Sequence, residues 1–493
     1  MPREIAESSR RARLALGVAA RKIPLAEPML AALLRAEREL GGDFRPERLI
    51  EHWSTRAVGN PIGQDRYRWE LTHKKGTGVP SYAGLPETWR AWRSSEQSVL
   101  EGDVFAFEER LTGLIIACES CELLAEAGDR DARAGAMLEE ATAVLRRDVA
   151  ACALERNAWA DSFGLWCVTR YPRIFEALLP IVIAVAESMA LRARATSGIV
   201  KGTRFPLHDR PLVSATAQLA STLLRLGSHF DIVAGAVRFV SSRLPTLGGW
   251  GDADDPPDLL TTLVAADLLA SCDPDFDPLR TALFVAERQE QSGWFRALGP
   301  EVPWLTLELV RFLQDAEKPF AARFRWPHVP GANLDRKTGL PFFAYFAELT
   351  RLFRELPGLA RSSLDVGFID LIGFREFNNR SGQQLGDEVL AEFAAALREL
   401  AEARIVRDGG DEFLIVGAPA SRNLAAMLRD VQRARPARFR ARFGSEAPTV
   451  LCRALTVRTN GAELGPTREI LGRAIGELKT APVDPELGIL REL

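Results

Sequence analysis

The sequence is poor in cysteine and lysine, and its most apolar stretch is interrupted by polar residues. Six cysteines are scattered over 493 residues, and no signal peptide is recognisable, so we expect reduced thiols in a cytoplasmic protein. The stretch 174–190 contains Glu176, Pro180 and Glu187, which favours a core helix over a membrane span. Cys118 and Cys121 form a single CxxC pair with no histidine nearby, which indicates a buried helical face rather than a zinc site.

The chain also lacks an excess of either charge. It has 63 basic and 66 acidic residues, for a formal net charge of −3, so no global field attracts it to nucleic acid or to an anionic membrane. With 47% hydrophobic residues it can bury large cores and should divide into two or three domains. Only seven of the basic residues are lysines, so the position of each lysine, Lys479 among them, calls for an explanation.

Changes in pattern along the chain predict a multidomain fold. Residues 1–95 begin with an Arg-rich helical pattern and continue into a loop-rich, aromatic stretch that we expect to pack on the helical domain after it. Residues 96–316 predict an all-α domain, residues 317–333 are Pro-rich and predict a linker, and residues 334–493 predict an α/β domain.

The all-α part shows apolar residues at helical spacing between short loops, which indicates an array of helix pairs. The predicted helices are Val104–Ala125, Ala132–Leu154, Ile174–Leu191, Leu212–Leu226, Asp231–Arg243, Leu259–Ser271, Pro278–Gln289 and Pro303–Gln314.

Two loops of this array share a Gly-Trp signature, at 249–250 and 293–294, and each leads into a new apolar helix. With Gln289 in front of the second, they resemble the α/α-toroid repeats of terpene cyclases and prenyltransferase β subunits, although Gly293 and Trp294 are adjacent where the family has one residue between. The segment Asp252-Ala-Asp-Asp255 also spells the DxDD acid of class II terpene cyclases. The prolines after it predict instead a solvated loop, with Asp258 near a helix N-terminus.

A polar turn, Asp408–Asp411, lies between the apolar runs Ile405–Val406 and Phe413–Val416. Apolar strands joined by residues that tolerate positive φ predict a β-hairpin. The adjacent carboxylates of Asp411 and Glu412 repel each other, so they suit a cation and a bound phosphate. An ordinary solvated acidic turn is the alternative interpretation of this stretch alone.

Five ordered motifs of the α/β part carry a second, more specific resemblance. They are Asp335-x-x-Thr-Gly-Leu-Pro341, Phe368-Ile-Asp-Leu-x-x-Phe374, Phe377-Asn-Asn-x-x-Gly382, Gly386-Asp-Glu-Val-Leu390 and Gly409-Gly-Asp-Glu-Phe413. Over about 160 residues this part resembles the GGDEF domain of diguanylate cyclases, which implies a palm-like nucleotidyl-cyclase fold.

The resemblance implies roles for individual residues. Asp370, Asp411 and the carbonyl of Leu371 would bind Mg²⁺ or Mn²⁺, and Glu412 and Lys479 would complete the catalytic set. Gly373, Phe374, Gly409 and Gly410 would surround the phosphates, because backbone N–H groups at a helix start and bare glycine backbone suit anions. Asn378 and Asp387 would read the guanine edge.

Departures from the family pattern keep several functions open. Ile372 stands where a second acid is common, Phe342-Phe343 replaces Asn-Arg, Val483 replaces an arginine, and Thr449–Val457 lacks Ser-x-Gly. Leu400 and Ala403 fill the places of the RxxD inhibitory site, so feedback by product is not expected.

The first hypothesis is therefore a diguanylate cyclase that acts on GTP as a homodimer. Its helical part would be an input module for an apolar ligand or a protein partner. The second hypothesis is a degenerate domain that binds nucleotide without turnover, and the third is an isoprenoid cyclase in the helical part.

Overall fold

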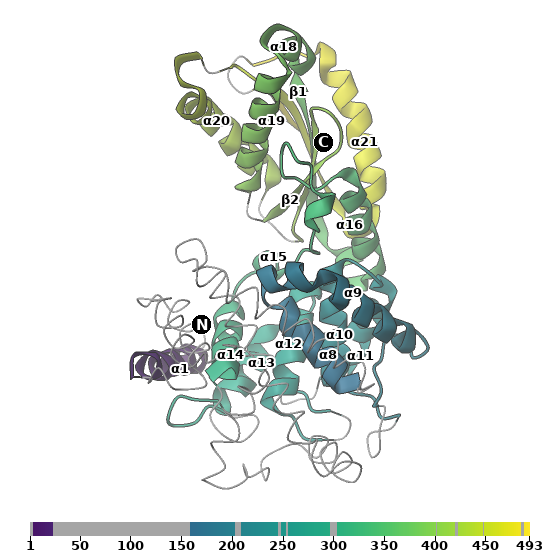
Figure 1. The fold of residues 1–493 in the computed structure, drawn as a ribbon, viewed down its shortest axis with the longest axis vertical. Helices are drawn as coiled ribbons and strands as arrows, with labels where there is room; N and C mark the ends of the chain where they lie inside the picture. Colours follow the sequence, from purple (N-terminus) through teal and green to yellow (C-terminus); the bar gives the residue numbers. More distant parts are fainter. Residues whose placement is uncertain are drawn as a thin grey trace, which may run out of the picture. The chain divides into compact units, whose positions relative to one another are not determined.

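The computed structural model describes residues 3–22, 158–202, 209–244, 248–252, 255–295, 303–400, 402–419, 423–446, 448–484 and 488–493 (Figure 1). They form two compact units. The first takes in the described residues up to Leu224, Asp231–Leu269 and Phe276–Glu317, and the second comprises Arg225–Phe230, Ala270–Asp275 and Lys318–Leu493. The predicted helices Val104–Ala125 and Ala132–Leu154, the Cys118–Cys121 pair and most of 1–95 lie outside the described residues.

The described part before Glu317 is helical, as its apolar spacing predicts. Its helices are α1 (Arg3–Lys22), α8 (Ala158–Thr169), α9 (Pro172–Arg194), α10 (Val213–Leu226), α11 (Phe230–Ser242), α12 (Leu259–Cys272), α13 (Pro278–Glu287) and α14 (Pro303–Asp315). Six of the helices predicted from the sequence fall on α9 to α14 with small differences at their ends. Whether the array closes into a toroid stays a prediction.

Three loops of the first unit repeat one local structure. Each contains a glycine in the left-handed region, at Gly198, Gly248 and Gly293, with φ of 93°, 86° and 92°. Two residues later a buried N–H donates to a threonine Oγ1, and that threonine is the fourth residue of the next helix. The pairs are Val200 with Thr216, Trp250 with Thr262 and Phe295 with Thr306, at 2.9, 2.9 and 3.2 Å.

This repeat corrects the alignment expected from the sequence. Phe295, fully buried, occupies the position of Trp250, whereas Trp294 is only half-buried. One residue therefore separates Gly293 from the buried aromatic ring, as it separates Gly248 from Trp250. The hydrogen bond to Thr306 marks the equivalent position, and the Gly-Trp pair alone misplaces it by one residue.

The loop at 248–258 is less solvated than the sequence indicates. Asp252 is buried and accepts hydrogen bonds from Ser214 N (2.7 Å) and Ser214 Oγ (2.5 Å). Burial raises the pKa of Asp252 to about 6 and that of Asp258 to about 7. Asp258 accepts from Leu260 N and Thr261 N at 2.9 Å, which is the expected cap at the start of α12. Asp254 lies outside the described residues.

Among the described helices, α9 is long and apolar enough to span a membrane by length and composition. Less than half of its most apolar window, 44%, is buried. Its inward side chains, such as Phe175, Leu178 and Val182, are nevertheless fully covered. Length and composition do not separate a membrane span from the core helix of a soluble domain.

The second unit is built on a five-stranded sheet of order β2-β3-β1-β4-β5. Its strands are β1 (Ser363–Ile372), β2 (Ala403–Arg407), β3 (Glu412–Gly417), β4 (Leu451–Asn460) and β5 (Ile489–Glu492). All pairings are antiparallel except that of β4 with β5. The predicted hairpin is confirmed as β2 and β3, and the central strand β1 is buried along nearly its whole length, so both faces of the sheet are covered.

Helices cover both faces of this sheet (Figure 1). The helices of this unit are α15 (Phe320–Arg323), α16 (Phe343–Glu355), α17 (Pro357–Arg361), α18 (Phe374–Ser381), α19 (Gln383–Arg398), α20 (Leu424–Phe443) and α21 (Leu464–Glu477), with short 3-10 turns η3 (Gly331–Asn333), η4 (Gly444–Glu446), η5 (Gly461–Glu463) and η6 (Leu478–Thr480). α19 and α20 lie on one face and α16 and α21 on the other.

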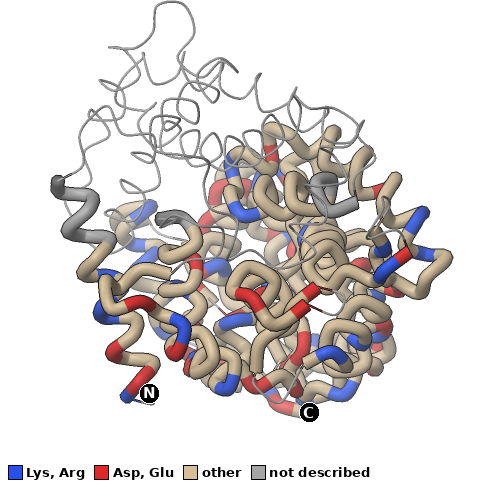
Figure 2. The backbone as a smooth tube through the Cα atoms, turned by 90° about the horizontal axis from the view of Figure 1, so that it is seen from below, with Lys and Arg blue, Asp and Glu red and all other residues tan. Residues whose placement is uncertain are grey.

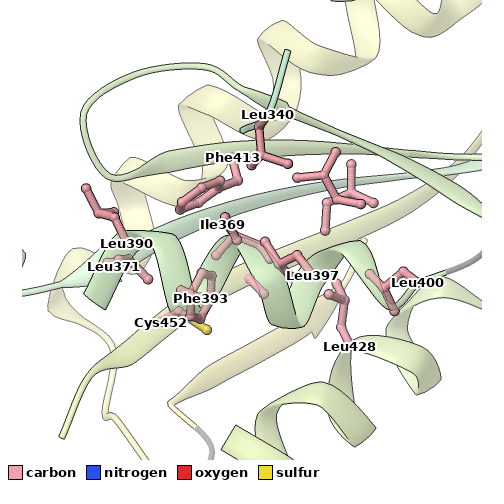
Figure 3. Packing of buried hydrophobic residues seen from close by; sticks show 14 of the residues in the cluster. Leu340, Ile369, Leu371, Leu390, Phe393, Leu397, Leu400, Phe413, Leu428 and Cys452 are labelled. Atoms are coloured by element: carbon pink, nitrogen blue, oxygen red, sulfur yellow. The ribbon is translucent and has the colours of Figure 1, made fainter. Parts of the chain in front are cut away.

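Apolar side chains spaced at helical intervals on α19 hold it to the sheet. Phe393 of α19 packs against Phe413 of β3, with ring centroids 5.5 Å apart, and Leu397 and Leu428 continue the same core (Figure 3). The long core fixes the register of β1 and β3, because a slip of one residue would turn every side chain to the other face. The ends of these strands, where the polar residues stand, are thereby fixed too.

The predicted linker 317–333 contains the short helix α15 and several packed side chains. Phe320 and Phe324 are buried, and the ring of Phe324 meets Trp326 edge-on with centroids 4.9 Å apart. Basic and acidic residues are both scattered over the described backbone (Figure 2), in keeping with the small net charge.

Candidate functional site

Three charged side chains stand in one row across the sheet. Asp370 of β1 is opposite Glu412 of β3 on one side and opposite Arg453 of β4 on the other. Directly opposed residues project to the same face, so the three groups lie side by side. Arg453 Nη1 donates to Asp370 Oδ2 at 2.9 Å, and each of the two side chains is only 12% exposed. The predicted acid Asp370 is therefore paired with a guanidinium.

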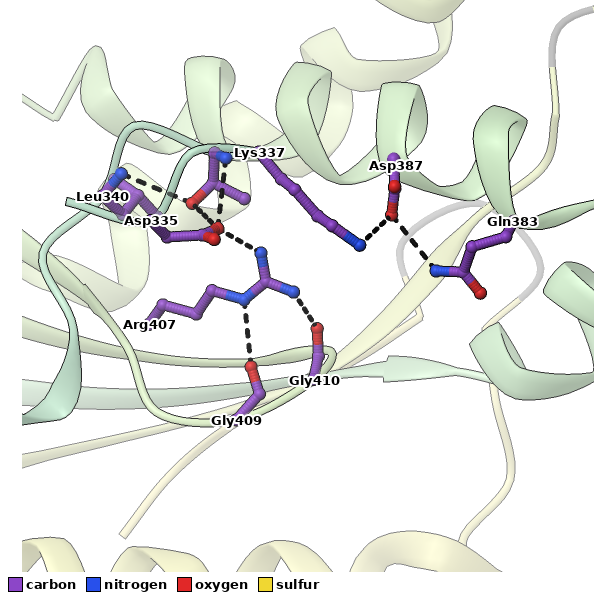
Figure 4. Close-up of polar contacts among 9 residues, drawn as sticks. Asp335, Lys337, Leu340, Gln383, Asp387, Arg407, Gly409 and Gly410 are labelled. Carbon is purple, nitrogen blue, oxygen red and sulfur yellow. Dashed lines mark hydrogen bonds and ion pairs between the residues drawn. The ribbon is translucent and has the colours of Figure 1, made fainter.

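Arg407, the last residue of β2, lies between the hairpin turn and Asp335 and contacts both (Figure 4). Arg407 Nε donates to Gly409 O at 3.1 Å, and Nη2 donates to Gly410 O at 2.6 Å. Its Nη1 forms an ion pair with Asp335, which also accepts from Thr338 N at 3.1 Å and from Thr338 Oγ1 at 2.7 Å. One guanidinium thus ties the Gly-Gly turn to the Asp-x-x-Thr-Gly-Leu-Pro motif.

The first residue of the turn has its own basic partner. Arg468 of α21 donates through Nη2 to Asp408 Oδ2 at 2.6 Å, and its guanidinium lies 5.1 Å from the ring centre of Phe343. The backbone N–H of Asp408 donates to Glu412 O at 3.0 Å and closes the hairpin. The N–H of Gly409 donates to the same carbonyl at 3.4 Å, so two arginines and two backbone hydrogen bonds set the geometry of the turn.

Asp411 and Glu412 lie at the exit of the turn, half-buried. Burial raises the pKa of Asp411, and the charge of Asp370 raises it further. The pKa of Glu412 is raised by burial and then by Asp370, Asp408 and Asp411. The charge of Lys479 lowers the pKa of both groups, so this lysine lies close enough to act on the two acids. Lys479 itself belongs to the turn η6, because α21 ends at Glu477 and not at Lys479.

The predicted phosphate loop joins β1 to α18. Gly373 adopts φ 66°, which a side chain disfavours, and caps α18. Phe374 is buried beneath this start and stacks on Phe377 at 6.1 Å, which fixes the direction of the helix. Gly373 is exposed, so the first N–H groups of α18 have the arrangement that suits an anion.

Asn378 and Gly386 form a close contact between α18 and α19. A Cβ at Gly386 would lie 1.7 Å from Asn378 Oδ1, so only glycine allows the amide to rest there. Asn378 Oδ1 is buried without a hydrogen-bond partner among the described residues. An unpaired acceptor costs free energy unless a ligand supplies a donor, which suits the predicted role of Asn378 with the guanine edge.

Asp387 begins a polar cluster on the outer side of α19. It accepts from Lys337 Nζ at 2.8 Å and from Gln383 Nε2 at 3.2 Å (Figure 4). The hydrogen bond from Lys337 lowers the pKa of Asp387, which keeps the carboxylate ionised. Arg407 also contributes to that lowering, so Asp387 and the arginine of the hairpin turn interact electrostatically.

As arranged, these donors do not fit a divalent cation. Carboxylates and a backbone carbonyl are the ligands that Mg²⁺ prefers, but the carboxylate of Asp370 is occupied by Arg453. Leu371 is buried, and its N–H donates to Asp411 O at 3.2 Å. In the part of the chain that the structure describes, no three His, Cys, Asp or Glu side chains gather as metal ligands.

Sequence reasoning missed three of the basic residues of this region, Lys337, Arg407 and Arg453. Arg407 is a lone basic residue at the end of an apolar strand, and Arg453 interrupts the apolar run of β4. Each of these breaks in an apolar pattern could have marked the residue as a candidate for the site. Their partners, however, lie 72 and 83 residues away in the sequence. The register of β1 with β4 brings Arg453 to Asp370, and the contact of the loop after η3 with the end of β2 brings Asp335 to Arg407.

A family model described as "Diguanylate cyclase, GGDEF domain" matches residues 332–451. Diguanylate cyclase TpbB of Pseudomonas aeruginosa, in strains UCBPP-PA14 and PAO1, is 39% identical over 99 residues, which are 20% of this chain and 22% of that protein. The chain thus spans about a fifth of the length of the curated relatives that it matches.

Solved structures similar to this chain include GGDEF domains. The GGDEF domain of DgcB from Caulobacter crescentus, in complex with c-di-GMP, is 20% identical with a TM-score of 0.29, covering 34% of this chain and 98% of that one. Diguanylate cyclase SiaD of Pseudomonas aeruginosa, in complex with its activator SiaC, is 24% identical with a TM-score of 0.29, covering 33% and 62%.

Proposed function

We propose that this protein, whose residues 332–451 are a GGDEF domain, is a diguanylate cyclase. It would bind GTP in its second unit and condense two molecules into cyclic di-GMP. In that reaction each 3′-oxygen bonds to the α-phosphorus of the other nucleotide, each hydroxyl loses its proton, and two pyrophosphates leave. Each domain holds one GTP, so two copies of the chain must meet, at least transiently.

The observation that carries the proposal is the grouping of a base-reading pair with a charged phosphate region. Asn378 offers an unpaired buried oxygen, and Asp387 is an ionised carboxylate, so both can accept from the N–H groups of guanine. Guanine presents N1–H and N2–H on that edge, whereas adenine presents an acceptor at N1, so this pair favours GTP over ATP.

The phosphates would lie between the start of α18 and the hairpin turn. The start of α18 supplies N–H groups, the Gly409–Gly410 turn admits close approach, and Lys479 supplies a positive charge. Positioning and charge stabilisation account for most catalysis of phosphoryl transfer, so such an arrangement has the right components.

A second candidate function is nucleotide binding without turnover. The ion pair of Arg453 with Asp370 favours it, because the carboxylate assigned to a metal ion is already neutralised. In this case the domain would regulate the helical part or a partner protein in response to GTP or a cyclic dinucleotide.

We propose the helical first unit as the input module of a cytoplasmic signalling protein. Its ligand would be an apolar small molecule or a protein partner. We do not extend the proposal to isoprenoid chemistry in this unit, since the proton donor of a DxDD motif is its central acid, Asp254, which lies outside the described residues.

The deciding experiment measures binding and turnover on the same sample of the full chain. Purified protein is incubated with GTP and Mg²⁺ or Mn²⁺, the products are separated by chromatography, and GTP binding is followed by calorimetry. Cyclic di-GMP from wild type, and none from Asp411→Ala, is the expected result. Binding without product would leave the second candidate, and absence of binding would refute both.

A further inference from the structure

The row Glu412–Asp370–Arg453 has an unusual charge balance. Two carboxylates opposite each other on neighbouring strands repel, and this destabilises a sheet. Here the third strand compensates, because Arg453 stands directly opposite Asp370 and pairs with it at 2.9 Å. The compensation lies within the domain, since β1 and β4 share one continuous ladder from Ser363 to Ile372.

The other ion pairs of the site leave Arg453 well placed for a further anion. Asp408 is paired with Arg468, and Asp335 is paired with Arg407. Arg453 uses Nη1 for Asp370, while its Nε is buried with no hydrogen-bond partner among the described residues. A guanidinium has five N–H donors in a planar fork that matches phosphate oxygens, so this group retains unused capacity.

A divalent cation and Arg453 would compete for the same carboxylate. To bind Asp370, the cation would have to displace a guanidinium that is 12% exposed and leave it buried without its counter-charge. Removing one partner of such a pair is costly. The guanidinium of Arg453 therefore occupies the position beside Asp370 that a divalent cation from solution would otherwise take.

We infer that Arg453 supplies the positive charge for the phosphates of GTP in this site, so that the nucleotide binds without a divalent cation. This inference rests on the proposed binding of GTP, but not on turnover. It makes Arg453 a binding residue that sets the metal requirement of the domain, and it gives the departure of β4 from the family pattern a specific consequence.

The first test uses the wild-type full chain and a fluorescent GTP analogue, titrated in excess EDTA and again in millimolar Mg²⁺. The inference expects dissociation constants that agree within about threefold. Binding that is lost in EDTA and restored by Mg²⁺ would overturn it, and the proposed function would stand. Absence of binding in both buffers would refute the proposed function itself.

The second test replaces Arg453 with glutamine. Hydrogen bonds from a charged donor carry enough free energy for roughly a 10- to 100-fold loss of affinity in EDTA. Arg453→Lys, which retains the positive charge, should recover part of the lost affinity for GTP. Arg458→Gln is the matched control, because Arg458 pairs with Asp365 across the same two strands at 2.7 Å but is 61% exposed. That control should leave binding unchanged, and equal losses in both glutamine variants would overturn the inference.

The third test removes the acid instead. If Asp370 serves to hold a cation, Asp370→Asn weakens GTP binding in Mg²⁺. If Arg453 binds the phosphates of GTP, the same substitution frees its guanidinium from the ion pair, and GTP binding in EDTA stays equal or becomes a few-fold tighter. Because the wild-type titration needs no substitution, a variant that does not fold leaves the inference open to refutation by the first test.

Discussion

The guanidinium of Arg407 should be the main support of the hairpin turn, and Arg407→Gln measures that support. Removing one partner of a well-buried ion pair costs about 3–5 kcal/mol, and here the two side chains are 12% and 13% exposed. Two further hydrogen bonds, to Gly409 O and Gly410 O, are lost or weakened. Thr338 still donates twice to Asp335, which limits the loss. We expect destabilisation by about 2–4 kcal/mol.

Hydrogen exchange of the full chain, read by mass spectrometry on peptides covering 403–417, is the suitable assay. It reports the opening of this hairpin and is not averaged over the helical unit. At about 1.36 kcal/mol per factor of ten, the expected loss corresponds to a roughly 30- to 900-fold fall in protection. Arg458→Gln removes an arginine that is 61% exposed, and its partner Asp365 keeps a hydrogen bond from Leu424 N at 2.9 Å, so this variant should leave the protection of the hairpin unchanged. Equal protection of the hairpin in the two variants would refute the reasoning.

The same ion pair predicts how this variant responds to acid. Burial alone would raise the pKa of Asp335, but hydrogen bonds from Thr338 and the Arg407 guanidinium outweigh it and hold the pKa below its ordinary value. A lowered pKa contributes stability above the ordinary value, and this stability is lost as pH falls through the folded value. In Arg407→Gln the protection of the hairpin should therefore fall less steeply on acidification than in wild type.

Three further substitutions test other parts of the molecule. Gly386→Ala places a methyl group 1.7 Å from Asn378 Oδ1 and should weaken GTP binding roughly 10- to 100-fold in titrations, without unfolding the domain, because the amide can move away. Asp411→Asn should raise the free energy of unfolding at pH 7 by up to about 1 kcal/mol and flatten the pH profile, because a raised carboxyl pKa means that stability declines as pH rises. Thr262→Val leaves the buried N–H of Trp250 unpaired and should cost about 1–3 kcal/mol in thermal unfolding of the helical unit.

Matched controls exist for two of these. Gly472→Ala adds a methyl group in α21, where nothing lies within 4 Å, and should leave GTP binding as it is. Thr281→Val removes a buried hydroxyl that has no partner among the described residues, so it should be neutral or stabilising. If Gly386→Ala binds GTP like Gly472→Ala, Asn378 does not read the base. A lower free energy of unfolding for Asp411→Asn than for wild type would contradict the unfavourable burial of the Asp411 carboxylate beside Asp370.

The elements of the second unit were predictable because their signals are local. A turn of residues that tolerate positive φ between two apolar runs specifies a hairpin, and β2 and β3 lie where that pattern puts them. The boundaries of α19 and α20 were less accurate, because polar residues at helix ends resemble loops. The apolar spacing alone predicts helices over Asp387–Ala401 and near Ser421–Arg433. In the structure α19 starts at Gln383, and α20 reaches Phe443.

The charge pairing of the site could not be predicted from the sequence in the same way. Asp370 stood out as an acid that ends an apolar strand, but its neutralisation by Arg453 depends on the register of β1 with β4. Asp252 was expected in solvent because prolines follow it, yet the helix start at Ser214 covers it. In both cases a residue far along the chain supplies the partner, and no local pattern contains that information.

The repeated glycine–threonine loops of the first unit have a consequence for how that unit acquires its structure. Each loop is closed by a hydroxyl only 16, 12 or 11 residues further along, so each step of the array can form before distant segments meet. Chains dominated by such near-neighbour contacts fold quickly, and their repeats can be gained or lost as whole units during evolution. The closing of any single step therefore does not depend on how many steps the helical part contains.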